Sequence, residues 1–280
     1  MSGTITASAR SDVGAVRSVN EDSFVAREPV FLVADGMGGH ARGDKASQEA
    51  VRVVGERIGS GSVVSAAVVL QAITEANRAV RALSGSGDTG VSVAGTTISG
   101  VVQIGDGDER RWMVVNVGDS RVYGWDGRTL TQLSVDHSAV QELVDAGAIE
   151  PEEAALHPER NIITRALGAA DDVDVDVWLL PVGGRQSFVI CSDGLTKELP
   201  DEHIARLLAQ AGSTDTNVAD ALVDAALAAG GRDNVTVIVV ESQSGEPLGG
   251  TDATVDRSDA ARAISEDTTP RIGEQERATR

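Results

Sequence analysis

The stretch Val30-Phe31-Leu32-Val33-Ala34-Asp35-Gly36-Met37-Gly38-Gly39-His40 decides how the rest of the chain is interpreted. Its first five residues are apolar, with β-branched valines at both ends of the motif Val-Phe-Leu-Val. Such a run is long enough for a buried strand but too short for a helix. It ends on Asp35 and Gly36, which present a carboxylate and an unobstructed backbone carbonyl. Both are hard oxygen ligands of the kind that Mg²⁺ and Mn²⁺ prefer. Taken alone, however, an Asp-Gly pair indicates an ordinary turn.

A dinucleotide-binding loop is a second interpretation of the same stretch. The residues from Gly36 to Ala41 fit the pattern G-x-G-x-x-G/A and follow an expected strand. Two features count against it. Asp35 would place a negative charge beside the pyrophosphate. In addition, residues 43–58 and 63–83 give two helical patterns in succession, where a βαβ unit needs a second strand.

The composition is that of an acidic chain of 280 residues, with 41% hydrophobic residues and a formal net charge of -19. This charge repels polyanions, so neither nucleic acid nor an anionic membrane is expected as a partner. It also repels a phosphorylated substrate unless bound cations reverse the sign locally. The single cysteine, Cys191, excludes an internal disulfide and suits a reducing compartment. Because the chain has no long apolar run and no signal-peptide pattern, we expect it to be soluble and cytoplasmic.

The order of the expected elements favours an α+β fold. Strands are expected at residues 4–9, 30–34, 91–104, 111–117, 121–125, 130–133, 173–180, 187–191 and 235–241, and helices at residues 43–58, 63–83, 139–146, 201–211 and 217–229. Residues 85–90 are expected to form a flexible connector, and residues 149–167 lack clear periodicity. Because strands and helices come in blocks, antiparallel sheets with helix layers are favoured over a parallel α/β fold. Residues 1–241 are expected to form one domain, and the polar residues 242–280 a disordered tail.

Four acids stand where β-rich runs begin or end. Asp35, Asp119 and Asp193 each lie beside a glycine at the end of such a run, and Asp233 opens the last one. Asp126-Gly127 serves as a control, because apolar alternation on both sides makes it a plain hairpin turn. One Asp-Gly pair is therefore uninformative. Four acids at the ends of separate strands would form a cation site only if the fold brings those ends together, which spacing alone does not show.

Six short motifs occur in a fixed order along the chain. They are Arg17-Ser18-Val19-Asn20-Glu21-Asp22, Asp35-Gly36-Met37-Gly38-Gly39, Gly95-Thr96-Thr97, Gly118-Asp119-Ser120-Arg121, Ser192-Asp193-Gly194-Leu195 and Asp233-Asn234-Val235-Thr236. In combination they resemble the metal-dependent PP2C-type (PPM) serine/threonine protein phosphatases in their bacterial form, over about residues 4–241. The resemblance implies a central antiparallel β-sandwich flanked by pairs of helices, a four-layer αββα arrangement.

The resemblance also implies a set of metal ligands. The carboxylate of Asp35 would bridge two Mn²⁺ or Mg²⁺ ions, and the Gly36 carbonyl with Asp193 and Asp233 would complete the protein ligands. Asp119 matches an acid at a third, weaker metal site, which Asp193 shares. Water between two divalent cations becomes a hydroxide nucleophile at neutral pH, and it would attack phosphorus directly without a covalent enzyme intermediate.

Other residues match positions around these ligands. Arg17 matches the phosphate-binding arginine, whose planar guanidinium can hold two phosphoryl oxygens, so Arg17 and Asp35 are the expected catalytic residues. Glu21, Asp22 and Asn234 match positions that support the ligands and order metal-bound water. Outside such a motif, Arg17 would be interpreted as a solvated surface arginine and the two acids as ordinary surface residues.

The chain departs from the family pattern at Met37, where eukaryotic members carry a histidine proposed as general acid. His40 lies three residues further on and is a candidate substitute, as is water on a metal. Cys191 invites comparison with the Cys-x5-Arg loop of tyrosine phosphatases, but residue 197 is Lys and the flanking sequence is that of a buried strand. Residues 136–168 correspond to the variable flap near the active site of the family. Arg160 and Arg165 are candidates to contact substrate there, although we favour their interpretation as solvated loop arginines.

The resemblance therefore implies a monomeric protein serine/threonine phosphatase that acts on phosphorylated proteins, including a serine/threonine kinase or its targets. The alternative from another class is a non-catalytic relative that serves as a binding module. The presence of Arg17 and all four matched carboxylates counts against that alternative.

Overall fold

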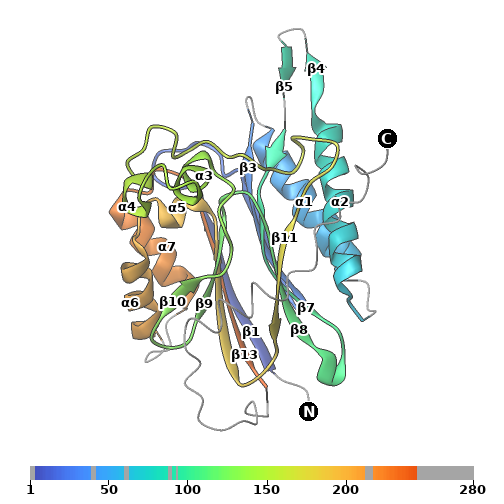
Figure 1. The fold of residues 1–280 in the computed structure, drawn as a ribbon, viewed down its shortest axis with the longest axis vertical. Coiled ribbons are helices and arrows are strands. Elements are labelled where there is room, and N and C mark those ends of the chain that lie inside the picture. Colours follow the sequence, from blue (N-terminus) through green and yellow to red (C-terminus); the bar gives the residue numbers. More distant parts are fainter. Residues whose placement is uncertain are drawn as a thin grey trace. The chain divides into compact units, whose positions relative to one another are not determined.

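Two antiparallel sheets lie between two pairs of helices in the computed structural model, which describes residues 4–38, 42–59, 63–87, 90–92, 94–211 and 217–244 (Figure 1). The first sheet has the order β1 (Thr4–Asp12), β13 (Val235–Gln243), β12 (Arg185–Cys191), β9 (Arg121–Trp125) and β10 (Leu130–Gln132). The second has the order β11 (Asp176–Pro181), β8 (Arg111–Val117), β7 (Ile98–Ile104), β3 (Val30–Met37) and β2 (Asp22–Arg27), with β6 (Gly95–Thr96) paired to β3.

The position of strand β3 in the sandwich explains why its residues are apolar without alternation. Successive side chains of a strand point to opposite faces of the sheet. Phe31 and Val33 face the layer between the two sheets, whereas Val30 and Leu32 face the helices. Trp112 lies at the centre of the inter-sheet layer, with its ring centroid 5.2 Å from that of Phe188 and 6.4 Å from that of Phe31. Both faces of β3 are therefore buried, and the strand holds Asp35 rigidly at its end.

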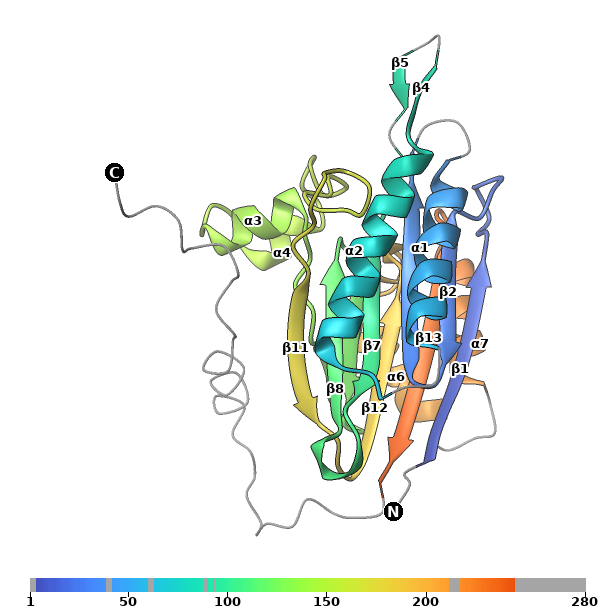
Figure 2. The ribbon, with the colours of Figure 1, turned by 90° about the vertical axis from the view of Figure 1, so that its right-hand side faces the viewer.

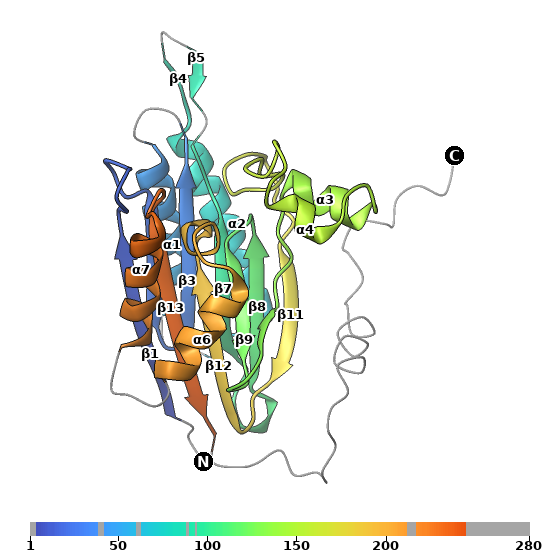
Figure 3. The same cartoon turned by 90° about the vertical axis from the view of Figure 1, so that its left-hand side faces the viewer.

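Helices α1 (Gly43–Ile58) and α2 (Ala66–Leu83) cover the sheet that contains β3 (Figure 2). Helix α1 buries Ala46, Ala50, Val54 and Ile58, which recur every four residues and so share one face. Helix α2 begins at Ser65, whose side chain accepts a hydrogen bond from the Val68 N–H at 3.3 Å. Helices α6 (Asp201–Ala211) and α7 (Val218–Ala229) cover the other sheet (Figure 3).

Helices α3 (Ala139–Asp145) and α4 (Pro151–Ala154) lie outside these layers, and a 3-10 turn spans Gly107–Glu109. The short helix α5 (Asp193–Thr196) packs Leu195 into the core beneath α6 and α7. Helix α5 follows β12 directly, so its first residue is the predicted ligand Asp193. In the described parts of the chain, no helix combines the length and the apolar character needed to cross a membrane.

The predicted αββα sandwich is confirmed, and several bounds match the prediction, among them those of α1, α6, β8 and β9. Two local predictions were wrong. The connector at residues 85–90 contains β4 (Gly85–Gly87), which pairs with β5 (Gly90–Ser92), and the strand predicted at residues 91–104 is divided among β5, β6 and β7. Strand β13 runs to Gln243, two residues past the predicted domain end. The rest of the predicted tail, residues 245–280, lies outside the described residues.

The strand neighbours decide against a dinucleotide-binding loop after β3. Strand β3 pairs antiparallel with β2 and with β7, and helices α1 and α2 follow it in succession. A βαβ unit requires a parallel neighbour reached through a crossover helix. The described part of the chain therefore offers no such unit at Gly36.

Candidate metal centre

The predicted ligands meet at one end of the sandwich. Asp35 lies near the end of β3 directly opposite Asp22 of β2, and Asp119 lies in the turn between β8 and β9. Asp193 follows β12, and Asp233 precedes β13. Burial, together with the negative charges of Asp22, Asp193 and Asp119, raises the pKa of Asp35 well above its ordinary value. The side chains of Asp35, Asp22, Asp193 and Asp119 therefore share one electrostatic environment, which the sequence could not show.

The motif Gly95-Thr96-Thr97 fixes the backbone of Asp35. The Asp35 N–H donates to Thr97 Oγ1 at 2.9 Å, and its carbonyl accepts from Thr96 Oγ1 and from the Thr97 N–H, each at 2.9 Å. The Thr97 hydroxyl also lies 2.8 Å from that of Ser120, the residue after Asp119. One threonine side chain thus links the ends of β3 and β8, and with them two of the predicted ligands.

Glycine is required at two positions beside the predicted ligands. A Cβ added to Gly36 would lie 2.1 Å from the Gly43 carbonyl oxygen, which is too close for any side chain. Gly118 has φ +109, and a Cβ there would lie 2.5 Å from Thr97 Cγ2. These close approaches bring the Asp35 end of β3 and the Asp119 turn against their neighbours.

Asn234 ties the loop before β2 to the start of β13. Its Nδ2 donates to the carbonyls of Val13 and Val19 at 2.9 and 3.0 Å, and its Oδ1 accepts from the Glu21 N–H at 2.9 Å. The side chain is 5% exposed. All of these partners belong to the segment that carries Arg17, so Asn234 holds that segment in place.

Two basic side chains contact the acids of the candidate centre. The Arg17 Nε and Nη2 atoms contact Asp233 Oδ1 and Oδ2 at 2.9 and 3.1 Å, which is a two-point contact of the guanidinium fork. The Lys197 ammonium contacts both Asp193 Oδ2 and Asp233 Oδ2, the latter at 3.2 Å. Sequence reasoning considered Lys197 only as a mismatch to tyrosine phosphatases. The signal for its role was its spacing of four residues from Asp193, which a helical turn converts into contact.

Several acid oxygens in this region have no partner. Among the described residues, the Oδ1 atoms of Asp22, Asp119 and Asp193 are buried without a hydrogen bond. Burial raises the pKa of Asp22 to about 7, although a hydrogen bond from Ser192 opposes the shift. Burial, with the charges of Asp193 and Asp136, also raises the pKa of Asp119 to about 7. Clustered buried carboxylates without counter-charges are costly, so these groups are suited to bind a cation.

The donor set fits divalent cations. Carboxylate oxygens are the preferred ligands of Mg²⁺ and Mn²⁺, and bound cations would give the unpaired oxygens a partner and offset the mutual repulsion of the acids. Within the described parts of the chain, no three acidic, histidine or cysteine side chains already converge as a complete metal site. Two of the predicted ligands, Asp193 and Asp233, instead contact Lys197 and Arg17.

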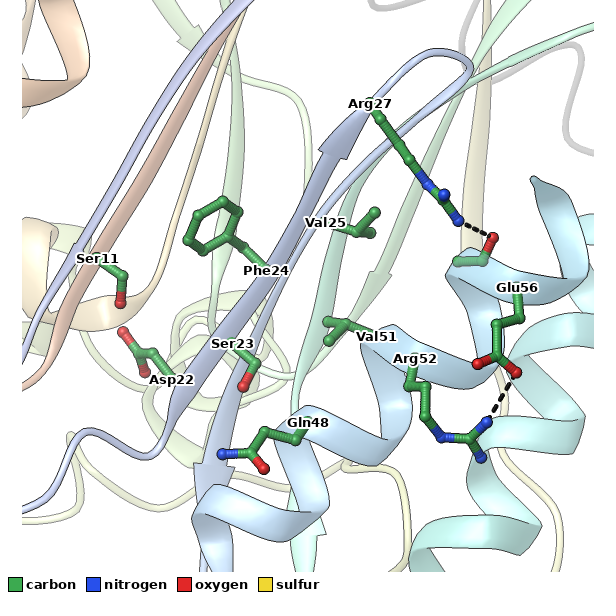
Figure 4. Close-up of a pocket in the computed structure, with 11 residues that line it drawn as sticks. Ser11, Asp22, Ser23, Phe24, Val25, Arg27, Gln48, Val51, Arg52 and Glu56 are labelled. Carbon is green, nitrogen blue, oxygen red and sulfur yellow. Dashed lines mark hydrogen bonds and ion pairs between the residues drawn. The ribbon is translucent and has the colours of Figure 1, made fainter.

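A separate groove of about 550 Å³ runs along β2 between β1 and α1. Figure 4 shows Asp22 and Phe24 on the side of β1, whereas Ser23 and Val25 point toward α1. Of the acids discussed above, only Asp22 lines this groove. We therefore place the candidate centre at the strand ends and not in this groove.

The remaining predictions concern residues around the centre. Cys191 is fully buried and packs in the core, as predicted, and burial raises the pKa of its thiol to about 12. Arg165 is not a solvated loop residue, because its Nη1 contacts Asp176 Oδ1 at 2.6 Å. The buried His137 accepts from the Gly118 N–H at 3.0 Å through Nδ1 and so supports the Asp119 turn. Met37 is half-buried, and His40 lies outside the described residues.

Comparison with known proteins identifies the family. The family model described as Protein phosphatase 2C matches residues 15–229, which include Arg17, Asp35, Asp119 and Asp193. The chain belongs to the protein phosphatase 2C family. This confirms the predicted class, a metal-dependent serine/threonine phosphatase. The serine/threonine phosphatase stp of Listeria welshimeri is 35% identical over 242 residues, which cover 83% of this chain and 94% of that protein.

Solved structures of the protein phosphatase 2C family have the same fold. A PPM Ser-Thr phosphatase of Mycobacterium smegmatis, solved with cacodylate, is 36% identical, with a TM-score of 0.74 over 84% of this chain and 97% of that one. The catalytic domain of the phosphatase PstP, solved with two manganese ions, is 34% identical, with a TM-score of 0.74 over 87% of this chain and 100% of that one.

Proposed function

We propose that this phosphatase hydrolyses phosphoserine and phosphothreonine in proteins, with Asp35, the Gly36 carbonyl, Asp193 and Asp233 as ligands of two tightly bound Mn²⁺ or Mg²⁺ ions. The observation that carries the assignment is that Asp35 lies close enough to Asp193 to feel its charge, and that Arg17 contacts Asp233, all at one end of the sandwich. A relative of this chain was solved with two manganese ions, which supports a two-metal centre.

Bound divalent cations would acidify a water molecule for attack on phosphorus and offset charge on the phosphoryl oxygens. The protein holds the ligands at fixed strand ends, so little reorganisation is needed when a phosphate enters. The guanidinium of Arg17 is half exposed and is oriented by its two-point contact with Asp233. We propose that Arg17 binds the phosphoryl group through the guanidinium N–H groups that do not contact Asp233.

A covalent route through the cysteine is unfavourable. Cys191 is fully buried, and its thiol pKa is about 12, whereas the thiolate is the nucleophilic form. Its position in the core of the first sheet also keeps it from a phosphoprotein. Direct attack by water, as the resemblance implied, agrees with this arrangement.

We also propose a third, weaker metal site at Asp119, shared with Asp193. Its support is the buried, unpartnered Oδ1 atom on each of these side chains. Calorimetry on Asp119→Ala tests the assignment, since this variant should keep the two tight sites.

We further propose that the partners are the phosphoprotein products of a serine/threonine kinase, including the kinase itself, because kinases make the bonds that this enzyme cleaves. A monomer is the state we expect, since each sheet of the sandwich is covered by the chain's own helices. Dephosphorylation of an autophosphorylated kinase and light scattering of the purified enzyme test these two points.

Hydrolysis of p-nitrophenyl phosphate tests the proposed activity. Turnover should appear with Mn²⁺ or Mg²⁺ and disappear in EDTA. The matched control is Asp126→Asn, because Asp126 is an exposed hairpin acid whose Oδ1 accepts from the Arg128 and Thr129 N–H groups. This variant should retain wild-type turnover, whereas Asp35→Asn should lose it. Full activity in EDTA would refute the metal centre, and phosphopeptide binding without turnover would favour the non-catalytic alternative.

A further inference from the structure

Lys197 occupies an unusual position among the acids of the candidate centre. It follows helix α5, one helical turn after Asp193, and its ammonium bridges two different ligands. It contacts Asp193 Oδ2 and lies 3.2 Å from Asp233 Oδ2. The other oxygen of Asp233 is held by Arg17 Nε at 2.9 Å. Both oxygens of Asp233 are therefore in contact with protein cations.

The surroundings of Lys197 explain why a cation is needed here. Asp22, Asp35, Asp119 and Asp193 are clustered, and burial raises the pKa of each. Burial alone would lower the pKa of Lys197, but the attraction of Asp193 and Asp233 raises it overall. Removing one partner from a buried charge cluster is strongly destabilising, since it leaves the other charges without compensation.

The chemistry of lysine suits a carboxylate contact that can break when another cation binds. The chain has 24 basic residues, and only Lys45 and Lys197 among them are lysines. An ammonium is a compact point charge on a flexible stem, whereas a guanidinium is a rigid fork that holds a carboxylate at two points. The Lys197 side chain is 38% exposed, so it can turn into solvent without rearrangement of the core.

We propose that Lys197 is a resident counter-ion of the metal ligands, which neutralises Asp193 and Asp233 in the metal-free enzyme and leaves them when a divalent cation binds. The proposal rests on the proposed function in taking these two acids as metal ligands. Since a cation bound to Asp193 and Asp233 would meet the ammonium on the same two carboxylates, metal binding would include the cost of breaking the Lys197 contacts. Lys197 thus weakens metal affinity and keeps the metal-free protein folded.

Calorimetric titration of the full chain with Mn²⁺ tests this proposal. Lys197→Gln removes the competing charge, so its Kd for Mn²⁺ should be about ten-fold lower than that of wild type, as expected for a lost charge-assisted contact. In EDTA the same variant should melt at a lower temperature than wild type. Lys45→Gln is the matched control, because Lys45 is exposed on α1. Its Kd for Mn²⁺ and its melting temperature in EDTA should both equal those of wild type. Lys197→Arg keeps the charge and should not bind Mn²⁺ more tightly.

A measurement on the wild-type chain covers the case in which Lys197→Gln does not fold. With lysine labelled selectively with ¹³C, the two side chains give separate signals, which Lys45→Arg assigns. Saturation with Mg²⁺ should move the Lys197 signal and leave that of Lys45 in place. An unmoved Lys197 signal at saturation, or equal Mn²⁺ affinity in wild type and Lys197→Gln, would overturn the proposal. A wild-type chain that binds neither cation would instead contradict the metal centre itself.

Discussion

Substitution of Asn234 by alanine should destabilise the enzyme through a defined set of contacts. The change removes three hydrogen bonds, to the Val13 carbonyl, the Val19 carbonyl and the Glu21 N–H, at a side chain that is 5% exposed. A buried polar group left without its partner costs about 1 to 3 kcal/mol. Because water can enter part of the space that the amide leaves, we expect a total loss of about 3 kcal/mol, at the lower end of the sum for three groups.

This loss corresponds to a fall in Tm of about 6 to 12 °C for a domain of this size. Urea denaturation measures the free energy of unfolding directly, and the m-value should stay constant if only the native contacts change. Asn161 provides a control, because it is exposed. Asn161→Ala should remain within about 0.5 kcal/mol of wild type.

The same variant should also affect substrate binding. The three partners of Asn234 lie in the segment that carries Arg17, so its release should raise KM for a phosphopeptide. Asn234→Asp keeps an acceptor for Glu21 but has no N–H group for the two carbonyls, and it adds a charge beside Asp233. We expect it to be no more stable than Asn234→Ala. If Asn234→Ala unfolds within about 0.5 kcal/mol of wild type, the three bonds do not anchor the loop.

Three further predictions concern the acids and Arg17. Asp193→Ala should nearly abolish turnover, whereas Asp119→Ala should slow it and retain the two tight metal sites; loss of tight Mn²⁺ binding in calorimetry of Asp119→Ala would contradict these roles. Arg17→Lys keeps the charge but loses the fork, so KM for a phosphopeptide should rise roughly ten-fold while the Kd for Mn²⁺ stays constant; unchanged kinetics would remove Arg17 from the site. The pKa of Asp22 and Asp119 is raised from 3.8 to about 7 in the fold, so the native state holds protons that the unfolded state releases. In EDTA, the contribution of these two acids to stability should therefore be greatest below pH 3.8 and should fall as the pH rises from 3.8 to about 7. A series of Tm values over this pH range can check the trend. A Tm that increases over the same range would contradict the direction of the expected change.

The sequence predicted elements best where one physical signal dominated. Helix α1 has a continuous apolar face, and β8 and β9 are separated by a Gly-Asp turn, so their bounds followed from pattern alone. The prediction for residues 85–92 failed because their glycines and serines indicate flexibility, whereas the pairing of β4 with β5 is a contact between backbones. A pattern of side chains carries no signal for it.

The candidate centre was predicted in part. The acids were found because motifs in a fixed order resembled a family, although their convergence depends on strand pairing over long sequence separations. The spacing of four residues between Asp193 and Lys197 was a signal for their contact, whereas the contact of Lys197 with Asp233 joins two different strand ends and left no signal in the sequence. Asn234 was predicted as a supporting residue, but the three backbone groups that it binds became evident only in the fold.

Strand β13 is the last element among the described residues, yet it lies inside its sheet, between β1 and β12. A ribosome releases the N-terminal end first, so β1 emerges more than two hundred residues before the strand with which it pairs. Asp233 and Asn234 emerge with that same late segment. A nascent chain therefore has an incomplete sheet and an incomplete acid cluster until its final strand is translated. Any product of premature termination before Asp233 should be unable to fold into an active phosphatase.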